Sequence, residues 1–254
     1  MVDRVLVLVT RTGLAGEELV RRLRGAGWNA IHCPPVQLAG PVDEQAVAES
    51  LASLLPVDRI IMTSGEAIAQ TATLIGSDTV ADTPVIVPGP GSALQARERG
   101  FRNVLSPPTA GNSEAMLTLP ELDKVDGLSV LILAAAGGRR LLESELRRRK
   151  ATVHRVHVYR RLDQPLPEGL EQSIQGAAGL VTLISSGGAL EALEKRLSAD
   201  VWSRVAAGRV VVPSQRVLDL AVDKGCLDVV NAGGADDDSM LAAMDGPTRT
   251  DQLR

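Results

Sequence analysis

The chain has 254 residues, a formal net charge of −4 and only four aromatic side chains, which are Trp28, Phe101, Tyr159 and Trp202. This length suits two domains of about 100 to 150 residues. Scarce aromatic residues and a negative charge argue against nucleic-acid binding, which needs stacking platforms and a basic surface. The sequence has neither an apolar run of the roughly 18 residues that cross a bilayer nor a signal-peptide profile. We therefore expect a cytoplasmic protein that does not bind membranes.

Short apolar runs alternate along the chain with amphipathic segments, and Gly and Pro residues separate them. This is the pattern of βα units on a parallel sheet, so the sequence predicts the α/β class. Helices fill the intervals, for example from Glu17 to Arg24 and from Arg140 to Arg149, where leucines share one face. Polar residues 245–254 lack periodicity, and we expect a disordered tail there. The predicted strands are, in chain order, residues 4–9, 29–33, 58–62, 84–87, 103–105, 129–133, 152–158, 179–184, 209–212 and 227–230.

The same layout occurs twice, about 122 to 125 positions apart, which indicates two copies of a domain-sized unit and not a solenoid of short repeats. The turn Thr63-Ser64-Gly65 after one apolar run returns as Ser185-Ser186-Gly187 after another. Residues 112–117 likewise return as residues 237–241. Two similar lobes form a cleft, so the repeat predicts a ligand.

Small hydroxyl and Gly residues follow several predicted strands, where ligands of open α/β sheets bind. Each such turn precedes a helix, so its Ser or Thr can cap the helix, and its free N–H groups can hold an anion. Any one turn is either an ordinary N-cap or a ligand contact. Because there are five in two matched copies, we expect a ligand with several carboxylates or phosphates. The turns are Thr10-Arg11-Thr12-Gly13, Thr63-Ser64-Gly65, Gly89-Pro90-Gly91-Ser92, Gly137-Gly138-Arg139 and Ser185-Ser186-Gly187.

Other site chemistries lack their signatures. No third Gly completes a dinucleotide fingerprint at Gly89-Pro90-Gly91, and no P-loop Lys follows a Gly-rich turn. The three histidines, His32, His154 and His157, have no Cys or carboxylate at metal-ligand spacing, so no metal site is expected. Ser64 lies outside a Gly-x-Ser-x-Gly elbow, which argues against a serine hydrolase.

Two further features have structural interpretations. Cys33 and Cys226 are expected to be reduced, half-buried thiols. The acidic run of residues 236–238 is interpreted as a solvated helix N-terminus, which the helix dipole favours, and not as a Mg²⁺ site.

The order and spacing of these motifs resemble the uroporphyrinogen-III synthase family over nearly the whole chain. These enzymes of tetrapyrrole biosynthesis use no cofactor. Ala134, Met62 and Lys150 depart from the family pattern, which has Arg, an aromatic residue and Gly at these places, and Ala134 removes one expected cation. The matching segments are Thr10-Arg11, Met62-Thr63-Ser64, residues 87–93, 112–117, 138–142 and 158–161, Ser185-Ser186-Gly187 and residues 212–216.

The resemblance implies two similar α/β lobes, each a parallel sheet flanked by helices, joined by a two-strand linker. Lobe one combines residues 1–36 and 164–254, and lobe two is residues 37–163. The connections near residues 33–37 and 156–161 occupy equivalent places in the two copies. Two such tethers would let the lobes open and close on a large substrate.

The resemblance also implies a reaction. The substrate is hydroxymethylbilane, a linear tetrapyrrole with eight carboxylates. Loss of its hydroxyl, attack by ring D through a spiro intermediate and reclosure give the type III macrocycle with ring D inverted. Such an enzyme is a lyase, acts on a small molecule and is expected to be a monomer. The alternative from another class is a non-catalytic two-lobed binding protein for a polyanionic small molecule.

Under this resemblance Tyr159 is the candidate acid that helps the hydroxyl to leave, and an anchoring role for its hydroxyl at the hinge stays open. Further candidate cations are Arg140, Arg160 and Arg161. The candidate substrate-binding residues are Arg11, Thr63, Ser64, Gly89, Ser92, Gly138, Arg139, Ser185, Ser186, Gly187 and Arg216.

Overall fold

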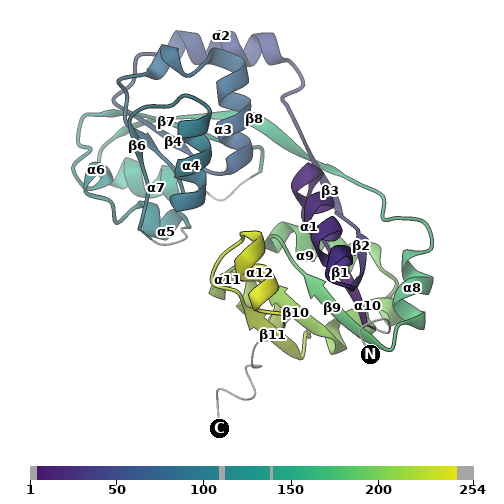
Figure 1. Cartoon of the computed structure of the whole chain (residues 1–254). Coiled ribbons are helices and arrows are strands. Elements are labelled where there is room, and N and C mark those ends of the chain that lie inside the picture. The colour runs from purple at the N-terminus through teal and green to yellow at the C-terminus, as the bar shows by residue number, and fades with distance from the viewer. Residues whose placement is uncertain (1–4, 109–111, 138–139, 245–254) are drawn as a thin grey trace. The chain divides into compact units, whose positions relative to one another are not determined.

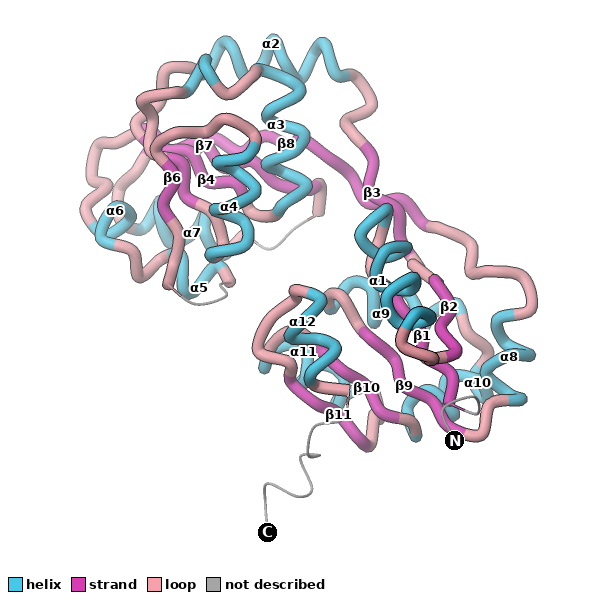
Figure 2. The backbone as a smooth tube through the Cα atoms, in the orientation of Figure 1, coloured by secondary structure: helices cyan, strands magenta, loops and turns pink. Residues whose placement is uncertain are grey.

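The computed structural model describes residues 5–108, 112–137 and 140–244 (Figure 1). The chain divides into two compact units, one of residues 1–37 with 162–254 and one of residues 38–161. Helices and strands alternate along both units (Figure 2). Each unit contains a sheet with helices packed on it, so the predicted α/β class is confirmed. No helix in the described ranges has both the length and the apolar character needed to cross a membrane.

The first unit has a five-stranded sheet in the order β11-β10-β9-β1-β2, and its neighbouring strands are parallel. Its strands are β1 (Val5–Val9), β2 (Asn29–His32), β9 (Gly179–Leu183), β10 (Arg209–Val212) and β11 (Asp228–Asn231). Its helices are α1 (Gly13–Gly25), α8 (Leu170–Gly176), α9 (Gly187–Arg196), α10 (Ala199–Ala207), α11 (Gln215–Asp223) and α12 (Asp237–Ala242).

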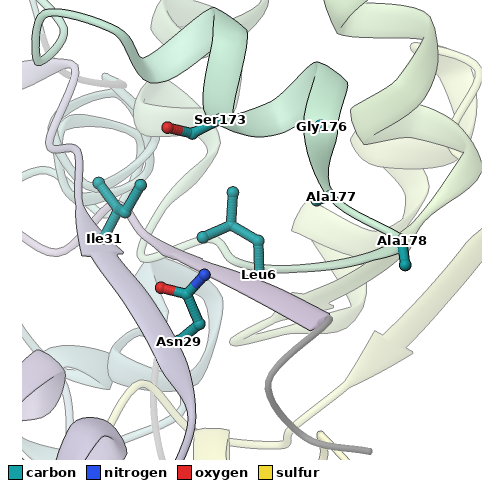
Figure 3. Close-up of a pocket in the computed structure, with 7 residues that line it drawn as sticks. All are labelled: Leu6, Asn29, Ile31, Ser173, Gly176, Ala177 and Ala178. Carbon is teal, nitrogen blue, oxygen red and sulfur yellow. The ribbon is translucent and has the colours of Figure 1, made fainter.

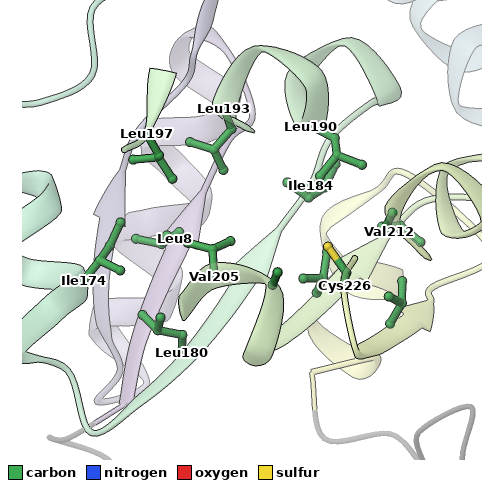
Figure 4. Close-up of a cluster of buried hydrophobic side chains, with 14 of the residues drawn as sticks. Leu8, Ile174, Leu180, Ile184, Leu190, Leu193, Leu197, Val205, Val212 and Cys226 are labelled. Carbon is green, nitrogen blue, oxygen red and sulfur yellow. The ribbon is translucent and has the colours of Figure 1, made fainter. Parts of the chain in front are cut away.

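Both faces of this sheet are covered. Leu6 and Leu8 of β1 belong to the cluster with α8, α9, α10 and α11, part of which Figure 4 shows. Val7 and Val9 point the other way and belong to the cluster with α1 and α12. A parallel sheet that is buried on both faces needs continuous apolar strands, which explains why β1 reads Val-Leu-Val-Leu-Val.

The second unit has a six-stranded sheet in the order β3-β8-β7-β4-β5-β6. Its strands are β3 (Val36–Ala39), β4 (Arg59–Met62), β5 (Val85–Ile86), β6 (Val104–Leu105), β7 (Ser129–Ala135) and β8 (Thr152–Asp163). Its helices are α2 (Glu44–Leu54), α3 (Gly65–Ile75), α4 (Pro90–Glu98), α5 (Ser113–Met116), α6 (Pro120–Asp123) and α7 (Leu141–Arg148), with a 3₁₀ turn at Asp78–Val80.

The two sheets share one strand order once the duplication is taken into account. The strands β6-β5-β4-β7-β8 correspond to β11-β10-β9-β1-β2, and each sheet takes strands from both sequence copies. In both sheets the strand before the Ser-Gly turn, β4 or β9, lies in the middle and pairs with β7 or β1. Equivalent turns therefore occupy equivalent places in their own units.

The sequence prediction was wrong about the end of one strand, since it ended the strand from residue 152 at 158 but β8 continues to Asp163. The local pattern also predicted no strand at residues 36–39, where β3 lies, although the family resemblance implied that this connection belongs to a two-strand linker. The prolines at 34 and 35 mask β3 in the sequence because they interrupt the strand pattern. The partner of β3 is β8, which lies far away in the chain, and the pattern of a single segment does not reveal such a pairing.

The helix ends repeat as well. Gly27, Gly100 and Gly225 follow α1, α4 and α11 with φ values of 87°, 91° and 84°. Lys150 follows α7 at the corresponding place with φ of 64°. Left-handed backbone favours glycine because it has no β-carbon. Lys150, which departs from the family pattern, is thus a position of backbone strain.

Candidate functional site

Two serines at the carboxyl ends of the central strands have nearly identical local structure. Ser64 follows β4 and Ser186 follows β9, with φ/ψ of −167°/165° and −166°/162°. The Ser64 hydroxyl accepts a hydrogen bond from the Ala67 N–H at 3.1 Å, and Ser186 accepts one from the Ala189 N–H at 3.2 Å. Both serines are therefore N-caps, of α3 and α9, while the other N–H groups of each first turn point out of the helix end.

The residue before each capping serine holds two strands together. The Thr63 hydroxyl donates to the Leu133 carbonyl at 3.1 Å. In the first unit the Ser185 N–H donates to Thr10 Oγ1 at 3.0 Å, and the buried Thr10 hydroxyl donates to the Leu183 carbonyl at 2.9 Å. These side chains fix the shape of the turn at the sheet edge, so their hydroxyls are already engaged within the protein.

A guanidinium lies against the first turn of α9. A β-carbon added to Gly187 would meet Arg216 Nη1 at 3.2 Å, a tight contact, so the guanidinium lies close to the backbone of this turn. Within the described ranges no carboxylate forms an ion pair with Arg216. The positive end of a helix repels a cation, and an anion bound between them would relieve that repulsion. Ser186, Gly187 and Arg216 are thus the best candidate for an anion site among the described residues of the first unit.

Ser214 adds an unused hydroxyl to the neighbouring turn. It is the N-cap of α11, which carries Arg216, and its side chain makes no capping hydrogen bond. This turn matches the family pattern, but Ser214 was not predicted as a site residue. Its position two residues before Arg216 was the signal that could have identified it.

The equivalent turn of the second unit is occupied by an uncharged side chain. The Gln95 amide donates to the Gly65 carbonyl at 3.0 Å, and a β-carbon on Gly65 would overlap with the Gln95 side chain. Gln95 corresponds to Leu220 of the first unit, which would lie 3.2 Å from a β-carbon added to Gly187, as Arg216 would. The two turns have diverged, since one has a cation beside it and the other a neutral amide. Sequence reasoning missed Gln95 because it lies inside α4, away from any turn motif.

Tyr159 joins the turn of the second unit. Its side chain is buried in the cluster that contains Ile60 and Leu133, with 4% of the residue exposed. The Ser64 hydroxyl donates to Tyr159 Oη at 3.0 Å. Either hydroxyl can donate in this pair, and with Ser64 as the donor the phenol proton of Tyr159 is available for another acceptor. The geometry fits both an acid and an anchor.

Two predicted cations hold the protein together. Arg11 pairs with Asp237 and donates to the Ala235 carbonyl, and Arg160 Nε donates to the Gly40 carbonyl at 3.0 Å. The backbone places Arg140 at the N-cap of α7, and Arg161 is exposed on β8. Among the predicted arginines that the structure describes, Arg216 is therefore the one whose position indicates an anion most directly.

The remaining candidates are less informative. Gly89 is the N-cap of α4, and Ser92 lies in the first turn of that helix, half-buried. Gly138 and Arg139 lie outside the described residues. The interpretation of residues 236–238 as a helix N-terminus is confirmed, because Asp236 caps α12 through the Ser239 N–H and Asp237 and Asp238 lie in its first turn. Asp236 and Asp238 are exposed, while the Asp237 side chain is 19% exposed.

Comparisons with known proteins agree with each other. A family model described as uroporphyrinogen-III synthase HemD matches residues 17–242. The uroporphyrinogen-III synthase of Escherichia coli strain K12 is 32% identical over 248 residues, covering 94% of this chain and 99% of the relative. That of Salmonella typhimurium is 31% identical over 247 residues with the same coverage.

The chain belongs to the uroporphyrinogen-III synthase family.

Solved structures agree on the fold of this family. The uroporphyrinogen III synthase mutant from the extremely thermophilic bacterium Thermus thermophilus has a TM-score of 0.62 and 18% identity, covering 87% of this chain and 89% of that chain. The uroporphyrinogen-III synthetase of Helicobacter pylori 26695 has a TM-score of 0.61 and 12% identity, with coverage of 99% and 100%. At these identities the likeness supports the α/β fold and nothing more specific.

Two departures from the pattern of the uroporphyrinogen-III synthase family are core residues. Met62 and Ala134 are 0% and 2% exposed, and both pack within the second unit. An Arg in place of Ala134 would need a polar partner in that cluster, since a buried unpaired charge is costly.

A cavity in the first unit lies away from the Ser186 turn. A cavity of about 520 Å³ lies beside β2 and α8, near the amino ends of the strands and not the carboxyl ends (Figure 3). It is lined by Leu6, Asn29, Ile31, Ser173, Gly176, Ala177 and Ala178. The candidate site is therefore assigned from the side-chain chemistry of the turns and not from the volume of a cavity.

The thiols are more buried than the sequence analysis expected. Cys33 is 0% exposed and Cys226 is 4% exposed, where half-burial had been predicted. Burial raises the pKa of the Cys33 thiol to about 12 and that of Cys226 to about 11. Neither is a nucleophile at neutral pH. In the described part of the chain no cluster of three or more His, Cys, Asp or Glu residues is arranged to hold a metal ion.

Proposed function

We propose that this chain is a uroporphyrinogen-III synthase, a lyase that closes hydroxymethylbilane into the type III macrocycle. Family membership supports the activity. The observation that carries the proposal is the pair of equivalent turns, in which Ser64 and Ser186 cap helices at the carboxyl ends of parallel strands. Helix N-termini bind carboxylates without a cofactor. A substrate with eight carboxylates offers many groups for turns of this kind.

The substrate carboxylates would be shared among many weak contacts. In the first unit the Ser186–Arg216 turn has the cation, and in the second unit the turn near Ser64 has hydroxyls and backbone N–H groups. Holding the two ends of a flexible chain in one folded geometry supplies a large effective molarity. The proposed substrate-binding residues are Arg11, Thr63, Ser64, Gly89, Ser92, Gly138, Arg139, Ser185, Ser186, Gly187 and Arg216. Residues 1–36 with 164–254 and residues 37–163 would act as two lobes, each with contacts of its own.

Tyr159 is the proposed acid. Its phenol proton would pass to the departing hydroxyl, which leaves as water and gives an electrophilic azafulvene. The substituted carbon of ring D attacks this centre, the spiro intermediate fragments, and reclosure inverts ring D. The proton lost from the closing pyrrole returns to Tyr159, so the sequence releases one water and leaves the enzyme unchanged. The hydrogen bond from Ser64 orients the phenol for this step.

Cyclisation of freshly made hydroxymethylbilane, with separation of the type I and type III products, tests the activity. We expect type III from the protein and type I from buffer alone, because the unbound bilane closes without inversion. Arg216→Gln should retain the type III preference with a higher KM. Retention of the bilane without cyclisation would favour a binding protein and overturn the proposal. We further propose that the enzyme works in the cytoplasm as a monomer, which gel filtration would test.

A further inference from the structure

The guanidinium of Arg11 has an internal carboxylate partner. Arg11 Nη1 pairs with Asp237, and Nη2 donates to the Ala235 carbonyl just before α12. The Arg11 and Asp237 side chains are 25% and 19% exposed, so water weakens their attraction only in part. Arg11 follows β1 directly at its carboxyl end, and all of these residues belong to the first unit.

Carboxylates outnumber guanidinium groups around this pair. Arg22 lies 3.6 Å from Asp237 and 2.7 Å from Asp238, and Asp236 caps the same helix. Two arginines thus face three aspartates, and the local charge is negative. Repulsion from a carboxylate disfavours a second anion nearby. A polycarboxylate that approaches Arg11 therefore meets a cation that is already neutralised.

The backbone of Arg11 is held independently of this ion pair. His32 Nε2 lies 2.7 Å from the Arg11 carbonyl oxygen, and a β-carbon on Gly16 would overlap with both atoms. Loss of the Asp237 charge would therefore remove the carboxylate partner of Arg11 Nη1, while the Ala235 carbonyl still accepts from Nη2 and the main chain of the turn stays in place. Asp237 does not cap α12, since Asp236 accepts the Ser239 N–H.

We infer that Asp237 is an affinity-determining residue, which competes with the carboxylates of the ligand for the Arg11 guanidinium. The inference rests on the proposed function for the role of Arg11 in substrate binding. It predicts opposite signs for two measurements. Removing the Asp237 charge weakens the fold by the loss of an ion pair but strengthens the binding of polycarboxylates.

The chain offers a matched control. Asp238→Asn removes the same charge from the same helical turn, but Asp238 pairs with Arg22 and not with Arg11. Asp237→Asn should lower the Kd for benzenehexacarboxylate, and the KM for hydroxymethylbilane, about fivefold, which corresponds to ~1 kcal/mol. Asp238→Asn should change either constant less than about twofold, because an exposed charge is screened. In an Arg11→Gln background the effect of Asp237→Asn should disappear.

Titration with benzenehexacarboxylate does not depend on catalysis, so it separates this inference from the proposed reaction. An unchanged or weaker affinity of Asp237→Asn, with circular dichroism showing an intact fold, would overturn the competition. Equal gains for Asp237→Asn and Asp238→Asn would also overturn it, because they would show a general charge effect. If the Kd falls as expected but no type III product forms in any variant, the reaction fails and the competition at Arg11 stands.

Discussion

Replacing Lys150 with glycine should stabilise the protein. Lys150 has φ of 64°, while the corresponding positions after α1, α4 and α11 are glycines. A side chain in the left-handed region costs ~1–2 kcal/mol. Glycine loses ~0.4–1 kcal/mol more backbone entropy on folding, so the net gain is about 0.5–1 kcal/mol. Lys150 Nζ lies 3.4 Å from Asp126, and the two side chains are 77% and 71% exposed, so loss of this ion pair costs little.

Thermal and urea unfolding of Lys150→Gly measure this gain. A gain of that size corresponds to a rise in Tm of about 1–4 °C for a domain of this size. Lys150→Ala is the matched control, since it removes the same ammonium but keeps the β-carbon. If Lys150→Gly were no more stable than Lys150→Ala, the strain attributed to the left-handed backbone would be refuted. The reverse change, Gly225→Ala, should destabilise the first unit.

Four other outcomes follow from the structure. Tyr159→Phe should lower kcat at least about tenfold with unchanged stability, because acid catalysis is lost while the ring stays packed. An unchanged kcat would exclude Tyr159 from the chemistry. Ser186→Ala should cost about 1 kcal/mol of stability through loss of its cap, and its KM should rise less than about a hundredfold if contacts are shared. Cys33 and Cys226 should resist a thiol reagent at pH 8 and react after denaturation, and labelling of the folded protein would contradict their burial. The Arg148 and Arg149 side chains lower the pKa of Glu145 from 4.5 to about 2. The Glu145 carboxylate should therefore stabilise the fold above pH 4.5 and lose that effect as the pH falls towards 2. The difference in unfolding free energy between the unmodified protein and Glu145→Gln should shrink over this range.

Much of the fold was predictable because local patterns determine it. The buried strands are continuous apolar runs, as in Val5–Val9, because both faces of each parallel sheet are covered. The helix ends were marked by glycines such as Gly100 and Gly225. By contrast, β3 is short, follows two prolines and acquires its partner from β8 more than a hundred residues later. Such pairing leaves no periodic signal in either segment.

The site was predictable in its turns but not in its ion pairs. Ser64 and Ser186 precede helices with the expected spacing, and both cap them. Arg11 could be recognised as a cation at a strand end, but its partner Asp237 lies 226 positions away and interacts through tertiary structure alone. Gln95 was missed for the same reason, since its contact with Gly65 depends on how α4 packs against α3. Long-range polar contacts decide which candidates remain available to a ligand.

The isomer ratio of the product tests the central claim most directly. With substrate held constant and enzyme increased, hydroxymethylbilane should be converted increasingly to the type III macrocycle, until spontaneous closure to type I is negligible. The account predicts that this fraction follows the concentration of folded protein and disappears on heat denaturation. A product that remains type I at every protein concentration, formed at the rate seen in buffer, would contradict it.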